Sequence, residues 1–181
     1  MNDDRDIKIY VRKDTSETSE FESISDNILH HVSNGNRDKA SELGAKMAKV
    51  KAEDGAVDIS GYKLSSSHLY QVRVLLTFTA EYSVQKNIEE KFLSDAASSG
   101  MYDYLKTNEQ RYYGNISDGG AFTFYLLALK KSGDTAQNIG EQFAMLCGTN
   151  KPEYIELGAE IFRAAEKYFT DMIKNTKFEQ I

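Results

Sequence analysis

The stretch SSSHLYQVRVLLTFTAEYSVQKN, residues 65–87, decides the fold that the sequence predicts. Apolar side chains recur along it at three- and four-residue steps, which is the period of a helix. A helix that is apolar over much of its circumference needs neighbours on several sides. We therefore expect a central helix over about 66–86 in an all-α fold. Its apolar side chains are Leu69, Val72, Leu75, Leu76, Phe78 and Tyr82.

Two further helices are predicted before this segment. The first is amphipathic and should end at SNGN (33–36), where Gly35 or Asn34 can adopt the left-handed conformation. Asn36 should then cap a second helix that runs to Val50, and the pair should form an antiparallel hairpin. Residues 53–65 break the helical rhythm and predict an ordered loop. The apolar positions are Phe21, Ile24, Ile28 and Val32 in the first helix, Ala40, Leu43, Met47 and Val50 in the second, and Val57, Ile59, Tyr62 and Leu64 in the loop.

Four or five helical segments follow the central one. We expect a helix over 88–100 that ends at Gly100, and one or two helical turns over 101–113. Asn115, Ser117 or Asp118 should cap a helix with Gly119 and Gly120 in its first turn. Its buried face should comprise Phe122, Tyr125, Leu126 and Leu129.

The last two helices have clear end signals. The sequence KKSGD (130–134) should close the preceding helix, and Asp134 should cap a helix over 135–147. Pro152 suits the first turn of the final helix. These elements predict one domain over residues 1–181, a bundle of about seven mostly antiparallel helices.

The N-terminal segment has a different pattern. Ile7, Ile9 and Val11 alternate with polar residues over 3–13, as in a half-buried strand. A lone strand needs a partner for its backbone, so a mobile tail is the equal alternative. We expect residues 1–18 to form a short strand or an extended or mobile arm.

Charge and composition narrow the classes of function. The chain has 181 residues and a formal net charge of −6, which disfavours nucleic acid as a partner because its affinity comes from basic residues. The N-terminus lacks the apolar run of a secretory signal, and no apolar run is long enough to span a membrane. We therefore expect a cytoplasmic protein with no membrane association.

Tyrosines are the best candidates for a functional site. Buried tyrosine needs a partner for its hydroxyl, so clusters of tyrosine line half-polar pockets or interfaces, although packing at the edge of a core explains them equally well. The Asp118-Gly119-Gly120 turn could bind an anion at a helix start, but close helix packing is the better interpretation. The candidate ligand-binding or interface residues are Tyr102, Tyr104, Arg111, Tyr112, Tyr113, Asp118 and Tyr125.

The sequence supports no catalytic residues, metal site or cofactor. His30 and His31 are adjacent and point about 100° apart on a helix, and the chain has no HxxxH, HExxH or CxxC pattern. Cys147 lies in an apolar helical context that is typical of a small core residue. We therefore expect no catalytic, metal-binding or cofactor-binding residues.

By elimination, the sequence favours a non-catalytic interaction or ligand-sensing module. The alternative is an enzyme with a site in a helical pocket near residues 111–125, where Tyr112, Tyr113, Arg111 and Asp118 are the first candidates. The partner would be a protein or a small molecule. Small residues at Gly140 and Ala144 also form a groove, which predicts a homodimer through the C-terminal helices.

Overall fold

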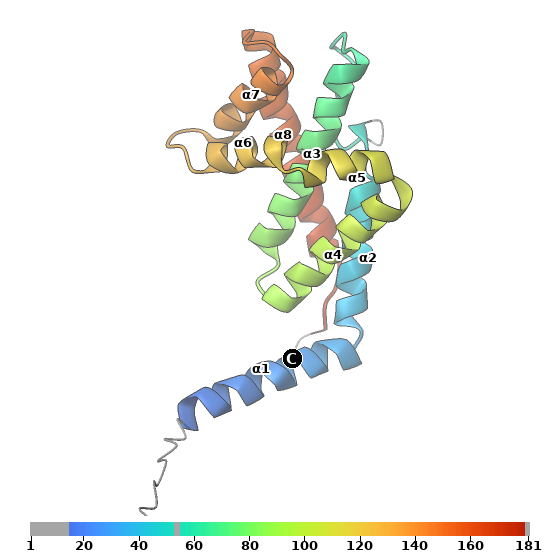
Figure 1. Ribbon diagram of the computed structural model, residues 1–181, viewed down its shortest axis with the longest axis vertical. Helices are drawn as coiled ribbons and strands as arrows, with labels where there is room; N and C mark the ends of the chain where they lie inside the picture. The colour runs from blue at the N-terminus through green and yellow to red at the C-terminus, as the bar shows by residue number, and fades with distance from the viewer. Residues whose placement is uncertain (1–14, 53–54, 180–181) are drawn as a thin grey trace, which may run out of the picture.

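The computed structural model describes residues 15–52 and 55–179, with side chains described from Ser23 onward. The described residues form eight helices and no strands, so the all-α prediction is confirmed (Figure 1). The predicted strand over 3–13 lies outside the described residues, and of the predicted arm 1–18 only the part from Thr15 is described, which is helical. The helices are α1 (Thr15–Ser33), α2 (Asn36–Lys49), α3 (Ser66–Asn87), α4 (Lys91–Asn108), α5 (Gln110–Ser117), α6 (Gly120–Leu129), α7 (Thr135–Leu146) and α8 (Pro152–Asn175).

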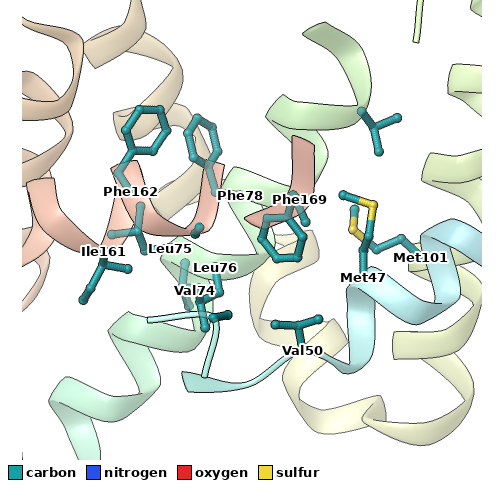
Figure 2. Packing of buried hydrophobic residues seen from close by; sticks show 14 of the residues in the cluster. Met47, Val50, Val74, Leu75, Leu76, Phe78, Met101, Ile161, Phe162 and Phe169 are labelled. Atoms are coloured by element: carbon teal, nitrogen blue, oxygen red, sulfur yellow. The ribbon is translucent and has the colours of Figure 1, made fainter. Parts of the chain in front are cut away.

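Helix α3 is the centre of the bundle, as its apolar pattern predicts. Nine consecutive residues from position 72 include only one that is not buried, Arg73. Figure 2 shows Leu75, Leu76 and Phe78 of α3 packed beside apolar side chains of α8, with methionines of α2 and α4 at the other end of the core. Leu69 is an exception to the predicted core. It lies near the start of α3 and is 43% exposed.

Helices α2 and α4 form the most extensive helix pair, and glycine makes their contact close. A Cβ on Gly44 would lie 1.8 Å from the carbonyl oxygen of Ala97, and a Cβ on Gly100 would lie 2.1 Å from that of Ser41. The predicted helix end at Gly100 is therefore wrong. Gly100 lies inside α4, where it lets the two backbones approach, and α4 continues to Asn108.

A second glycine-lined contact joins α7 to α8. A Cβ on Gly140 would lie 2.1 Å from the carbonyl oxygen of Ile155, so α8 of the same chain fills the groove that suggested a subunit contact. The end signals of these helices are confirmed. The Asp134 side chain accepts hydrogen bonds from the backbone N–H groups of Ala136 and Gln137, and Pro152 is the first residue of α8.

Helix α1 departs from the predicted hairpin. Gly35 has a φ of 77°, as expected for the turn, but α1 leaves α2 at a wide angle and extends away from the other helices (Figure 1). Apolar side chains of α1 therefore remain open to solvent: Ile24 is 57% exposed, Leu29 62% and Val32 49%. A hairpin would have buried them.

Asn36 holds the α1–α2 corner instead of capping α2. Its side chain is fully buried and pairs with the backbone of Glu179, because Oδ1 accepts from the Glu179 N–H and Nδ2 donates to the Glu179 carbonyl, both at 2.8 Å. Nδ2 also lies 3.1 Å from Nδ1 of buried His31. Since Nδ2 can only donate, His31 Nδ1 is the acceptor. The cap residue of α2 is Gly35, without a side-chain hydrogen bond.

The segment between α2 and α3 is an ordered loop where it is described, as predicted. Val57 is buried, and Ile59, Tyr62 and Leu64 are partly buried against the core. In the described part of the chain, no helix combines the length and apolar character needed to cross a membrane.

Candidate functional site

Tyr112, the central residue of the predicted tyrosine cluster, is fixed by α3. It lies on α5 and is partly buried, with its hydroxyl 2.7 Å from the Thr77 hydroxyl and donating to the carbonyl oxygen of Arg73 at 3.2 Å. Burial is the largest of the influences on its hydroxyl and raises the Tyr112 pKa well above its usual value. Its hydroxyl is thus a protonated group already engaged by protein.

Arg73, which the sequence did not single out, organises the same region. Its guanidinium donates to the carbonyl oxygens of Ala48 and Val50 at the end of α2, and pairs with Glu109 at 3.0 Å. It also lies 5.4 Å from the ring centre of Tyr112. Because one side chain joins α2, α3 and the α4–α5 junction, Arg73 is a structural clamp.

The tyrosines of α4 and α5 pack at the edge of the core. Tyr102 and Tyr113 meet edge to face with ring centres 6.5 Å apart, and Lys49 lies 5.1 Å from the ring centre of Tyr104. Burial raises the pKa of Tyr102 well above its usual value. These three side chains are half-buried and are not among the residues that line the pocket beside Tyr112.

Tyr125 belongs to the core. It is completely buried on α6, and its ring centre is 5.0 Å from that of Phe78. Its hydroxyl is buried and has no hydrogen-bond partner among the described residues. Burial raises its pKa well above the ordinary range. A side chain without access to solvent cannot contact a ligand in this conformation.

Arg111 and Asp118 lie on the surface, and Arg111 shares a pocket with Tyr112. This pocket, of about 440 Å³, is lined by Tyr70, Glu109, Arg111, Tyr112 and Asn115. This pocket therefore brings together two of the seven candidates, Arg111 and Tyr112, while Tyr102 and Tyr113 contact each other outside it. Asp118 is the residue after α5, and none of the three proposed caps starts α6, because Gly119 with a φ of 74° occupies that position.

Two ionisable groups outside the predicted set are unusual. Burial raises the pKa of Glu81 on α3, although hydrogen bonds from Ser98 and Gln85 oppose this, and its Oε2 is buried with no partner among the described residues. Burial likewise raises the pKa of the Cys147 thiol to about 11, so it is protonated at neutral pH. Within the described residues, no three His, Cys, Asp or Glu side chains gather as a metal site would require.

A larger pocket lies beside the α1–α2 corner, near the C-terminal end of α8. It has a volume of about 900 Å³ and is lined by His31, by the α3–α4 connection, including Asn87 and Ile88, and by the segment after α8, including Phe178. It also contains three acidic residues and two lysines. This mixture of charges does not select one class of ligand.

Helix α6 has the feature that the sequence analysis missed. Leu126 was predicted to be buried, but it is 52% exposed, and Phe124 and Leu127 are 41% and 54% exposed. Tyr125 and Ala128 supply the buried side of the helix. The signal was present in the sequence, since residues 120–129 contain no charged side chain and a helix without charges has no face suited to water.

No family model matches the chain, and no curated protein or solved structure is significantly similar to it. The functional argument therefore rests on the chain's own surfaces and contacts.

Proposed function

We propose that this chain is a non-catalytic interaction module and that α6 is the surface that receives its partner. The observation that supports this is the exposure of Phe124, Leu126 and Leu127 on a helix with no charged residue. Single exposed apolar residues are common on protein surfaces, whereas a contiguous group marks an interaction site.

The three exposed side chains are contiguous on the helix. At about 100° per residue, Leu126, Thr123, Leu127 and Phe124 follow one another around the solvent side of α6. Phe124 and Leu127 are three positions apart and therefore neighbours along the helix. We call this surface, formed by Phe124, Leu126, Leu127 and the intervening Thr123, the α6 face.

The charges beside the α6 face indicate the chemistry of the partner. Lys130 and Lys131 follow the helix and are exposed, with Lys131 paired to Glu141 of the same chain at 3.5 Å, and Asp118 precedes the helix. A partner helix with an apolar stripe and acidic residues near the lysines would match both properties, since helices that bind in this way supply apolar anchors three and four positions apart and complementary charges fix their orientation.

The enzyme alternative has less support from the geometry. Of its four candidates, Arg111 and Tyr112 line one pocket, while Tyr113 packs against Tyr102 and Asp118 is an exposed residue between helices. The hydroxyl of Tyr112 is held by Thr77 and a backbone carbonyl. The homodimer through the C-terminal helices stays a prediction, although α8 covers the Gly140 groove that suggested it.

An affinity pull-down tests this proposal. The tagged chain, with its α6 face unchanged or altered by substitution, is mixed with extracts of its own cells, and the retained proteins are compared. Leu127→Glu places a charge in the middle of the face, and Thr107→Glu, at an exposed position of α4, is the matched control. We expect the same partner with the unchanged chain and Thr107→Glu, and at least tenfold less with Leu127→Glu. Equal retention by all three proteins, each with the same helical circular dichroism, would overturn the proposal.

A further inference from the structure

Exposed apolar side chains concentrate on two helices that do not contact each other within the chain. Among the described side chains, nine large apolar residues are exposed, of which four lie on α1 and three on α6. Both helices therefore present apolar surface that the chain covers at most in part, since Ile24 and Ile28 also line a pocket with Phe92 of α4. The four on α1 are Ile24, Ile28, Leu29 and Val32.

We propose that the partner on the α6 face is α1 of a second copy of this chain, and that two copies exchange these helices reciprocally to form a dimer. This inference rests on the proposed function of the α6 face and names its occupant. The argument has three parts, which are the apolar stripe of α1, its charges, and its direction.

The apolar stripe of α1 has the form of a helix that binds to another helix. Ile24, Ile28 and Val32 are four positions apart, so they lie along one side, and they span about 12 Å at the helical rise of 1.5 Å per residue. Leu29, the most exposed of the four, extends the stripe. The stripe therefore supplies the regularly spaced apolar side chains that a helix bound to the α6 face would need.

The charges of α1 complement those around α6. The α1 sequence contains Glu17, Glu20, Glu22 and Asp26 and no Lys or Arg, and its two histidines lie in the last turn. Residues Lys130 and Lys131 follow α6, and Asp118 precedes it. Pairing the acidic half of α1 with the lysines requires the two helices to run antiparallel, because opposite charges then meet at one end of the contact.

The direction of α1 permits the exchange. The helix extends away from the rest of its own chain (Figure 1), and the fully buried Asn36 ties the corner from which it starts to the backbone of Glu179. A contact between two different surfaces either propagates into filaments or closes into a ring. Reciprocal exchange closes with two copies, since each gives one α1 and receives one.

Sedimentation of two variants, separately and mixed, tests this arrangement. Leu29→Glu disables the donated helix and Leu127→Glu disables the receiving face, with Thr107→Glu as the control. We expect the unchanged chain and the control to have twice the 20.4 kDa chain mass, and each of the two variants to dissociate at least tenfold more readily. An equimolar mixture of the two should regain dimer, because one unaltered helix then meets one unaltered face.

A disulfide experiment tests the orientation. With Cys147 replaced by Ala, Ser25→Cys in one copy and Lys130→Cys in the other should form an interchain disulfide in an antiparallel arrangement, and neither variant should form it alone. The inference is overturned if only one of the two Glu variants weakens the dimer, which would indicate α1–α1 or α6–α6 contact, or if their mixture recovers nothing.

The two proposals can fail separately. A chain that is monomeric at roughly 0.1 mM, yet loses a different partner protein when Leu127 is changed to Glu, overturns the exchange and leaves the interaction function standing. A monomer whose retained proteins are indifferent to Leu127→Glu overturns both.

Discussion

Gly44 of α2 lies against the backbone of Ala97 of α4 so closely that a Cβ on the glycine would be 1.8 Å from the carbonyl oxygen. No side chain can give way there, because the obstructing atom belongs to a helix backbone. The separation of these two helices is therefore fixed by the absence of one methyl group.

We expect Gly44→Ala to lower the free energy of unfolding by about 3 kcal/mol or more, because the two helices must move apart. Gly114→Ala is the control, since a Cβ at Gly114 on α5 meets nothing within 4 Å. It should raise stability by up to about 1 kcal/mol through helix propensity alone. Urea denaturation followed by circular dichroism measures both, and equal stabilities would contradict the close contact.

Arg73→Lys should destabilise the fold by about 1–3 kcal/mol. Arginine reaches two carbonyl oxygens of α2 and the Glu109 carboxylate together, whereas a lysine ammonium lacks the planar fork that this geometry uses. Arg37→Lys, at an exposed position, should change stability by less than about 0.5 kcal/mol. Chemical denaturation of both variants provides the comparison, and a loss of the same size at Arg37 would argue against the clamp.

Removing the hydroxyl group should have different effects on the stability of the fold at Tyr112 and at Tyr125. Tyr112→Phe loses a hydroxyl bonded to Thr77 and to the Arg73 carbonyl, which should cost about 0.5–1.5 kcal/mol of stability. Tyr125→Phe removes a buried hydroxyl that has no partner among the described residues, so stability should be unchanged or higher. Thermal unfolding of the two proteins at one pH decides the matter, and a marked loss for Tyr125→Phe would mean that its hydroxyl has a partner.

Glu81 should make stability depend on pH in the acidic range. Burial raises its pKa in the folded chain above the usual 4.5, so the folded state holds the proton more tightly and stability falls as the pH rises through this range. Glu81→Gln should therefore gain stability relative to the unchanged chain at pH 7 and lose that advantage below pH 4.5. Denaturation series at several pH values measure the difference, and a difference independent of pH would contradict the raised pKa.

Much of the fold follows from patterns along the sequence. The period of residues 65–87 predicted the central helix, and Asp134 and Pro152 marked helix starts correctly, because capping depends on neighbouring residues. The prediction at Gly100 was wrong because glycine occurs both where a helix ends and where a neighbouring helix approaches closely, and the residue type is the same in both cases. Only the position of α2 in space distinguishes them.

The candidate site could be predicted less well. The tyrosines of residues 102–125 were predicted as candidate site residues, but the partners that occupy Tyr112 and the enclosure of Tyr125 depend on α3, some 35 or more positions away. The exposure of the α6 face was also missed. An apolar helix sequence does not reveal which of its sides the rest of the chain covers.

The pairing of Asn36 with Glu179 joins residues 143 positions apart. A chain is synthesised with its N-terminal part first, so α1 is made long before the Glu179 backbone to which Asn36 is hydrogen-bonded. The corner from which α1 departs can reach its final geometry only after almost the whole described chain has been released. Because synthesis runs from one end of the chain to the other, the direction of α1 relative to the bundle is set only after the rest of the bundle has been made.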